Sequence, residues 1–444
     1  MRVVMYVMND VAHDSRVRRE AATLAAAGHE VTIMATPLPE TRSDPRDPDD
    51  LPGVRILRVA VPTGTPWWAT AVRAPWRLPV LGSIALLPWT IVRAAWVISV
   101  NRLLGRPVQA GGIDFVRRWR VEWLGWCRSA VSAAPIADVH HAHDMEALPA
   151  ARTAARRDGS RYVYDSHEIY MAWGPVLRQP RLVRRLVGAW ERRLARGAAA
   201  VITIGEGVAG ELAAAFGLPE ILVVRNCPPK WQPPATPQNH IRRAAGIDPD
   251  VPLVLCHGGF MANRGLEQTA EAMLEPGLEH AHLVFLGYRA AFLNAILGDP
   301  RLAGRVHYLP AVPPSDVVAW VAEADVDVIA IQPVDLNSRL SVPNKLFESL
   351  AGGVPVVSTD IAERRLILLG DPEGPLGALC DPTSPASIAR AVRSILELDQ
   401  AARTSMRTRI LTAAHARWNW ETESLVLIDL YRRLASDATG SLPI

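Results

Sequence analysis

The stretch "RVVMYVMNDVAHDSRVRREAATLAAAGHEVTIMA" (residues 2–35) contains two apolar runs separated by a helical pattern. Apolar runs without polar alternation are typical of parallel strands that are buried on both faces. Between the runs, Asp14 or Ser15 can cap the start of a helix, and Gly28 suits the position just past its end. The stretch therefore predicts a β-α-β unit with a right-handed crossover, the opening of an α/β domain.

The same alternation continues along the chain and occurs in two series. The polar, Pro-rich stretch at 226–240 separates the series and reads as a linker. Strands are expected at 54–60, 136–143, 161–167 and 198–205 in the first series and at 252–259, 281–287, 305–310, 326–331 and 354–358 in the second. Helices are expected in the second series from 264, near 288–297 and from 315. Two such series predict two doubly wound α/β domains that face each other across a cleft, with ligands at the carboxyl ends of the strands.

Composition narrows the class of protein. The 444 residues are 49% hydrophobic and 21% charged with a net charge of +3, which is typical of a globular protein and gives no basic stripe for nucleic acid. No CxxC pair is present, so we expect neither a zinc site nor a disulfide framework. Isolated cysteines predict a reducing compartment. The first apolar run is too short for a signal-peptide core, which predicts a cytoplasmic protein. The cysteines are Cys127, Cys227, Cys256 and Cys380.

One region does not fit the alternating pattern. Residues 62–126 hold eight of the fourteen tryptophans, and the segment 78–100 carries a single charge, Arg93. Three interpretations are open: helices that sink partly into a membrane surface, an internal helical hairpin that covers the sheet, or a membrane span. The stretch 177–197 has seven arginines and one glutamate at helical spacing, so it either rests on anionic lipid or is an ordinary solvated face. Because of these two stretches, the protein is a candidate for peripheral attachment to the inner face of the plasma membrane.

The clearest binding signal lies in "SVPNKLFESLAGGVPVVS" (341–358), where Pro343 suits the first position of a helix. Lys345 is one of two lysines in a chain with forty-six arginines, and a cation in the first turn of a helix is unfavourable unless an anion binds there. Glu348, one turn later, can accept two hydrogen bonds from a ribose diol. The pattern favours a phosphate at this helix start, and the alternative is a weak surface salt bridge between the two side chains.

A second phosphate signal follows the first strand of the second series. Gly258 and Gly259 allow the backbone to approach a ligand closely, and Arg264 opens the next helix. Glycines followed by an arginine at a helix start suit a diphosphate. The alternative interpretation is a plain turn.

In the first series, "HHAHDMEALPA" (140–150) and "YDSHEIY" (164–170) follow strands. They place His143, Asp144, His167 and Glu168 at one sheet edge. The spacing matches no zinc signature, so we expect hydrogen-bond partners for substrate hydroxyl groups and no metal. The D-x-D in "ADVDV" (324–328) sits at the mouth of an apolar strand and is not expected to bind metal.

With these residues in place, the chain resembles a family 4 glycosyltransferase of the GT-B fold. The similarity covers most of 1–60 and 136–435. The segments that carry it, in order, are "DSRVRREAATLAAAGHEVTIMA", "HAHD", "DSHE", "AVITIGEGVAGELAAAFGLPEILVVRNCPP", "GGFMANRGLEQ", "PNKLFESLAGGVPVVS" and "WNWETESLVLIDLYRRL". The resemblance implies an N-terminal Rossmann-like acceptor domain (1–225), a C-terminal donor domain (226–415) and a closing helix (416–444) that crosses back to the first domain.

The resemblance also implies site residues. Such enzymes transfer a sugar from a nucleoside diphosphate sugar, usually with retention and without metal. The implied catalytic residues are His143, His167, Asp144 and Glu348; the implied donor-binding residues are Gly258, Gly259, Arg264, Asn226, Asn344, Lys345 and Glu348; the implied acceptor-side residues are Asp14, Arg16 and Glu168. Two features depart from the family: Leu340 stands where a second glutamate is common, and the glycine pair replaces an arginine of the phosphate loop.

Several function classes stay open at this point. The first is a glycosyltransferase whose acceptor is lipid-linked or amphiphilic, or else soluble. A sugar-nucleotide epimerase of the same architecture would use Asp144 and Glu168, and a non-catalytic partner subunit would bind nucleotide without turnover. A dinucleotide dehydrogenase is disfavoured, since no GxGxxG follows the first strand.

Overall fold

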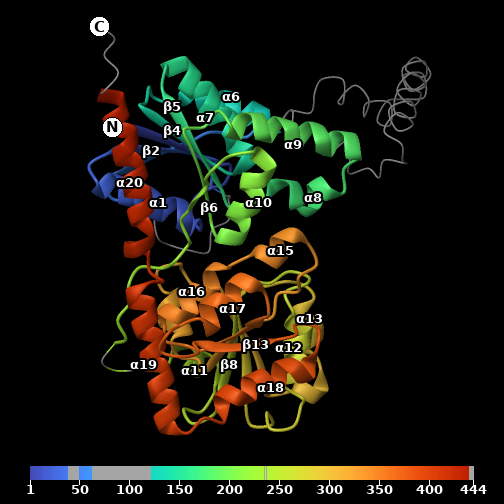
Figure 1. Cartoon of the computed structure of the whole chain (residues 1–444). Coiled ribbons are helices and arrows are strands. Elements are labelled where there is room, and N and C mark those ends of the chain that lie inside the picture. Colours follow the sequence, from blue (N-terminus) through green and yellow to red (C-terminus); the bar gives the residue numbers. More distant parts are fainter. Residues whose placement is uncertain (39–49, 63–121, 235, 237, 440–444) are drawn as a thin grey trace, which may run out of the picture.

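A computed structural model of the chain describes residues 1–38, 50–62, 122–234, 236 and 238–439. These residues form two halves, each built on a parallel sheet with helices on both faces (Figure 1). Within this part of the chain, no helix is both long and apolar enough to cross a membrane. Nearly all of the Trp-rich stretch predicted at 62–126 lies outside the described residues, so its three interpretations remain predictions.

The first half is built on a seven-stranded sheet in the order β3-β2-β1-β4-β5-β6-β7, with every neighbouring pair parallel. Its strands alternate their side chains between two apolar layers, one under α1 and the other under α6, α7, α9 and α10. The elements are β1 (Arg2–Tyr6), α1 (Ser15–Ala26), β2 (Glu30–Ala35), β3 (Val54–Arg58), α6 (Leu124–Ala133), β4 (Val139–His143), α7 (Asp144–Asp158), β5 (Arg161–Ser166), η3 (Tyr170–Ala172), α8 (Gly174–Leu177), α9 (Arg181–Ala195), β6 (Ala200–Thr203), α10 (Glu206–Phe216) and β7 (Leu222–Val223).

The second half is built on a six-stranded parallel sheet in the order β10-β9-β8-β11-β12-β13. Both sheet orders reverse direction beside their first strand, which is where doubly wound folds bind ligands. The elements are α11 (His240–Ala245), β8 (Leu253–Gly259), α12 (Leu266–Ala272), β9 (His282–Tyr288), α13 (Leu293–Leu297), η4 (Pro300–Leu302), β10 (Val306–Pro310), α14 (Val317–Val321), β11 (Val326–Ile329), α15 (Leu336–Leu340), α16 (Asn344–Ala351), β12 (Val356–Thr359), α17 (Ala362–Leu369), β13 (Gly377–Cys380), α18 (Pro385–Leu396), α19 (Gln400–Ala416) and α20 (Trp420–Thr439).

The last helix belongs in space to the first half. While α19 packs on the second sheet, α20 crosses back and lies beside α1 (Figure 1). Its apolar residues Leu427, Leu430 and Tyr431 are buried in the same layer as β1 and β2. The two-domain α/β fold with a returning C-terminal helix, predicted from the sequence, is confirmed.

Some predicted helix starts were wrong by one to five residues. Pro343 does not occupy the first helical position, because it is the N-cap and α16 begins at Asn344. The helices expected from 264, near 288 and from 315 begin at Leu266, Leu293 and Val317. By contrast, α1 begins as expected, with the Asp14 carboxylate accepting a hydrogen bond from the backbone N–H of Val17.

Candidate active site

A cavity of about 400 Å³ opens between the two halves at the carboxyl ends of the strands. The second half contributes most of its lining and α1 with the preceding loop contributes the rest. Six of the seven predicted donor-binding residues line it, namely Gly258, Gly259, Arg264, Asn344, Lys345 and Glu348, and His13, Ser15, His257 and Tyr288 join them. The structure therefore brings together residues that lie up to 335 positions apart between His13 and Glu348 (348 − 13).

Two cations, Lys345 and Arg264, line the second-half side of this cavity, and a third, Arg364, is buried close to them. Burial lowers the pKa of the Lys345 amino group; the nearby Asp327 carboxylate opposes this shift, and repulsion by the Arg264 and Arg364 guanidinium groups adds to it. The pKa of Arg364 falls to about 10, first through burial and then through Arg264. Among the residues that the structure describes, none of the three forms a salt bridge; the Lys345 ammonium donates to the His257 carbonyl at 3.3 Å, and Arg364 donates to Ser341. An anion bound here would relieve their mutual repulsion.

Two positions beside these cations require glycine because of their backbone conformation. Gly258 has φ +98°, a conformation that side chains rarely adopt, at the end of β8. Gly265 starts α12 with φ +71°, and a Cβ there would lie 2.2 Å from the Ala330 carbonyl oxygen. Glycine therefore lets the chain turn from strand to helix while its backbone borders the cavity.

On the first-half side, His167 is held between two carboxylates. Its ring lies 3.2 Å from Asp144 and 3.2 Å from Asp165, and its backbone N–H donates to Asp144 at 2.9 Å. Burial disfavours the charged ring, but the two carboxylates outweigh burial and raise the pKa of His167 well above its ordinary value. The two carboxylates therefore favour the protonated, charged form of the His167 ring.

His143 lies behind His167 and is 1% exposed. Its Nδ1 is 3.3 Å from the His167 ring and 3.3 Å from Asp165, and burial lowers its pKa. The neutral His143 and charged His167 form one hydrogen-bonded unit, and His167 stands nearer to solvent.

Arg16 anchors this unit from below. Its guanidinium binds both oxygens of Asp165, at 2.7 and 2.8 Å, and also pairs with Glu20 at 3.1 Å. Glu20, His141, His143 and Asp165 present ligand-type atoms within 4.8 Å of one another. Because Asp165 is already shared by Arg16, His143 and His167, this cluster is charge-compensated by the protein itself.

A second cavity of about 430 Å³ continues from the first, since Asn344 and His13 line both. Predicted residues on its wall are Asp14, Arg16, His167 and Asn226. Asn226 accepts a hydrogen bond from Arg19 and donates to Ser15 at 3.4 Å. His143 and Asp144 stand behind this wall.

Glu168 lies at the seam between the halves. Its carboxylate accepts a hydrogen bond at 3.4 Å from Asn337 on α15 of the second half. Burial, aided by Asp144, raises the pKa of Glu168 to about 7. Leu340, where the family often has a glutamate, packs against the apolar layer of the first half near Gly207.

Sequence reasoning missed His13, Ser15, His257, Tyr288 and Arg364. Two of these make contact across the cleft: the His13 ring meets the Tyr288 ring edge-on, with centroids 6.1 Å apart. The available signal was position, since His13 follows the first strand and His257 directly precedes the glycine pair.

Comparisons with known proteins were made against families and structures. Residues 13–229 match the family described as glycosyl transferase 4-like domain, and residues 251–398 match glycosyl transferases group 1. None of the curated proteins matches the sequence.

Solved structures share the fold at low identity. Sucrose-phosphate synthase from Thermosynechococcus elongatus is 16% identical with a TM-score of 0.68, over 98% of this chain and 100% of that one. Anabaena HepE, solved in complex with UDP, is 13% identical with a TM-score of 0.64, over 98% and 100%. Trehalose 6-phosphate synthase from Burkholderia multivorans is 14% identical with a TM-score of 0.62, over 100% and 98%.

Proposed function

This chain belongs to the glycosyltransferases with the GT-B fold, and from that premise we propose that it transfers a sugar from a nucleoside diphosphate sugar to a hydroxyl acceptor, with retention and without metal. The observation that carries the proposal is a pair of cations, Lys345 and Arg264, that line the interdomain cavity beside a glycine loop, with the buried Arg364 close to them. Among the described residues, none of the three forms a salt bridge. HepE, with the same fold, was solved with UDP and with UDP-glucose, which supports a nucleotide donor.

The proposed chemistry uses these cations on the leaving group. The bond between the anomeric carbon and a diphosphate oxygen breaks, and its electron pair stays on the diphosphate. Lys345, Arg264 and the start of α16 stabilise that growing charge. The acceptor oxygen bonds to the same carbon and gives up its proton to the departing diphosphate oxygen, which lies on the same face when configuration is retained.

The first half supplies the sugar and acceptor side in this proposal. The His167 ring, with its two nitrogens held by Asp144 and Asp165 and with His143 behind it, places positive charge beside the transferred sugar. Asp14 and Glu168 face the acceptor. Arg16 acts indirectly, because its guanidinium is bound to Asp165.

The test is a thermal-shift screen with UDP, GDP, ADP and TDP, followed by incubation of the matching nucleotide sugar with acceptors. A ligand that binds only the folded state raises Tm with concentration. We expect one base to be preferred and free nucleoside diphosphate to be released with the transferred sugar. Interconversion of the sugar would support the epimerase instead, binding without turnover would support a partner subunit, and no shift with any nucleotide would refute the proposal.

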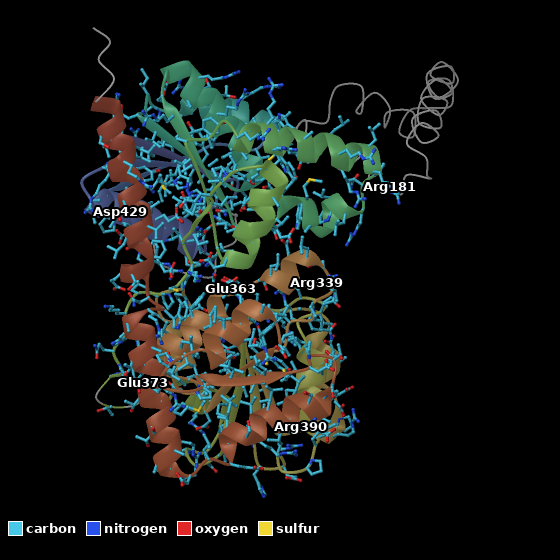
Figure 2. The ribbon with its side chains drawn as sticks, viewed as in Figure 1. Arg181, Arg339, Glu363, Glu373, Arg390 and Asp429 are labelled. Carbon is cyan, nitrogen blue, oxygen red and sulfur yellow. The ribbon has the colours of Figure 1, made fainter. Side chains whose placement is uncertain are left out.

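We further propose that the acceptor is amphiphilic and that α9 rests on an anionic membrane surface. The face of α9 turned to solvent carries Leu182 and Leu186, which are 52% and 63% exposed, beside Arg181 and Arg185. Arg181 is labelled at the outer end of this helix in Figure 2. Exposed leucines flanked by arginines match the interface of an anionic bilayer in both polarity and charge.

Vesicle co-sedimentation tests this surface. The protein should bind phosphatidylglycerol vesicles and not phosphatidylcholine vesicles, and replacing Leu182 and Leu186 by serine should abolish that binding. Leu425→Ser, which changes a 54% exposed leucine on α20, is the matched control. Equal binding by the double variant would remove α9 from the proposal, and full activity without lipid would favour a soluble acceptor.

A further inference from the structure

A row of three interacting charged side chains begins at the wall of the donor cavity and runs into the sheet. His257, at the end of β8, is 2% exposed and lies between Asp327 of β11 and Glu348 of α16. Its Nδ1 is 3.2 Å from an Asp327 oxygen, and its Nε2 is 3.1 Å from Glu348 Oε2. Both ring nitrogens therefore face carboxylates, and both contacts are hydrogen bonds only if the ring carries two protons.

The surroundings favour that charged ring. Burial opposes it, but Asp327 and Glu348 outweigh burial and raise the pKa of His257 to about 9. Asp327 is held in turn by the Ser349 hydroxyl, which donates to its other oxygen at 2.8 Å. The far end of the row is thus fixed inside the sheet, and its near end is the Glu348 carboxylate on the cavity wall.

The same residue also positions the neighbouring cation. The backbone carbonyl of His257 accepts a hydrogen bond from Lys345 Nζ at 3.3 Å. Lys345 and Glu348 stand one turn apart on α16, and both line the cavity. One histidine therefore sets the ammonium through its backbone and the carboxylate through its ring.

We propose that His257 is a positioning residue that aims the Glu348 carboxylate at the ribose hydroxyls of the donor nucleotide. The inference rests on the proposed function, because it takes a nucleotide to lie in this cavity. With Glu348 Oε2 held by the His257 ring, Oε1 makes no hydrogen bond within the described residues, and it is left for the diol. Asp327, itself held by Ser349, keeps the His257 ring from rotating when Glu348 binds the nucleotide.

The experiment compares a nucleoside diphosphate, with the base preferred in the screen, against its 2′,3′-dideoxy analogue. Wild-type protein should bind the ribonucleotide about tenfold more tightly or better, the effect of hydrogen bonds to a charged group. Glu348→Gln and His257→Leu should both lose most of this preference while binding the dideoxy analogue as wild type does. His257→Gln should restore part of it, because its amide N–H can donate to Glu348.

A matched control and a kinetic readout separate positioning from general damage. His282→Leu alters another strand histidine of the same sheet, paired with His307 and outside the cavity, and should leave the preference intact. In turnover, His257→Gln should raise the donor KM more than it lowers kcat. If His257→Leu does not fold, the Gln variant alone decides: a preference unchanged from wild type overturns the proposal.

The remaining outcomes are equally decisive. Equal weakening of both nucleotides in the folded His257 variants would overturn the proposal in favour of a purely structural role. Failure of wild-type protein to bind any nucleoside diphosphate would refute the proposed function, and the role of His257 with it. The first result would be seen only in the His257 variants and the second already in wild-type protein, so failure of this inference can be told apart from failure of the proposed function.

Discussion

At the scale of single residues, the two halves differ in how the charged side chains of the site are paired. The lysine and the arginine that the second half contributes to the cavity form no salt bridge within the described residues, and His167 of the first half contacts two carboxylates. Lys345 and Arg264 face a cavity with no carboxylate bonded to either within the described part of the chain, whereas His167 sits between two carboxylates. Asp327 attracts Lys345, and Asp335 and Glu168 attract Arg264, but burial outweighs these carboxylates and lowers the pKa of both cations. Buried cations of this kind favour an anionic ligand. A lysine at 345 in an arginine-rich chain is consistent with this role, because a compact ammonium fits beside the His257 carbonyl.

Lys345→Met is expected to weaken nucleoside diphosphate binding about tenfold or more, since one charge-assisted contact to the diphosphate is lost. Without ligand, Tm should stay the same or rise, because burial disfavours the charge that has been removed. Isothermal titration and thermal melting measure the two effects. The chain provides its own control, Lys230→Met, which alters the only other lysine at an exposed linker position. Unchanged affinity for the diphosphate would contradict this assignment.

The raised pKa of His257 predicts a pH dependence of stability. Its folded pKa is about 9 and its ordinary value is 6.5, so the folded state holds the extra proton between these values. The stabilisation is complete below about pH 6.5 and is lost as pH rises through 9, to a total of about 3 kcal/mol at most. Urea unfolding of wild type and His257→Gln at pH 6.5 and 9.5 measures the difference. The variant should lose less stability over this range, and an identical loss would contradict the prediction.

Local sequence was sufficient for one part of the site and not for another. Gly258, Arg264, Lys345 and Glu348 were predictable because each lies within a short pattern at a strand end or helix start. His257 was not, since its role depends on Asp327 and Glu348, which lie 70 and 91 positions away. Asp327 meets it through the pairing of β8 with β11, and Glu348 meets it through the packing of α16 on the sheet. Spacing does not report such contacts.

At the scale of elements, one helix of the first half is capped by a residue of the second. Gly205, the N-cap of α10, has no side chain to bind the free N–H groups of that helix. The carboxylate of Glu363 on α17 binds them instead, at 3.1 Å from Glu206 N and 3.2 Å from Gly207 N. Figure 2 shows Glu363 between the two halves. The contact ties α10 of the first half to α17 of the second.

Glu363→Ala is expected to weaken this fastening by about 1 kcal/mol, the usual effect of losing a helix cap. The halves should separate more often, so limited proteolysis in the linker 226–240 should be faster. Glu373→Ala, a change at an exposed glutamate on the same half that Figure 2 also labels, is the control. Equal cleavage rates in both variants would show that the cap does not hold the halves together.

Elements with a clear local signal were the easiest to predict. The buried strands and α1 were found from apolar runs and caps, because long periodic segments carry the strongest signal. The two-residue strand β7 and the five-residue helix α15 were missed, since too few residues are present to display a period. Pro343 was placed one position too far into α16, because proline is favourable on either side of a helix start.

At the scale of the whole molecule, the two halves share a boundary that the sequence order does not reveal. Helix α20 follows the second half in sequence but completes the first, where Tyr431 is fully buried and its hydroxyl lies 3.0 Å from His141 Nδ1. His141 stacks on His143, with ring centroids 4.6 Å apart. The closing helix is therefore part of the packing behind His143.

Tyr431→Ala is expected to destabilise the first half by about 3–5 kcal/mol, the range for removing a large aromatic side chain from a core. Urea unfolding followed by tryptophan fluorescence should then show the first half unfolding before the second. Leu425→Ala, at an exposed position of the same helix, should change stability by less than about 0.5 kcal/mol. A single unshifted transition in Tyr431→Ala would mean that α20 contributes little to this core.

The return of α20 also has a consequence for biosynthesis. Domains of a growing polypeptide generally fold in order as they leave the ribosome. Here the sheet that emerges first keeps one apolar face without its full cover until the entire second half and α20 have been translated. The half made earliest is thus the one finished latest, and during that interval its uncovered face is a natural target for chaperones.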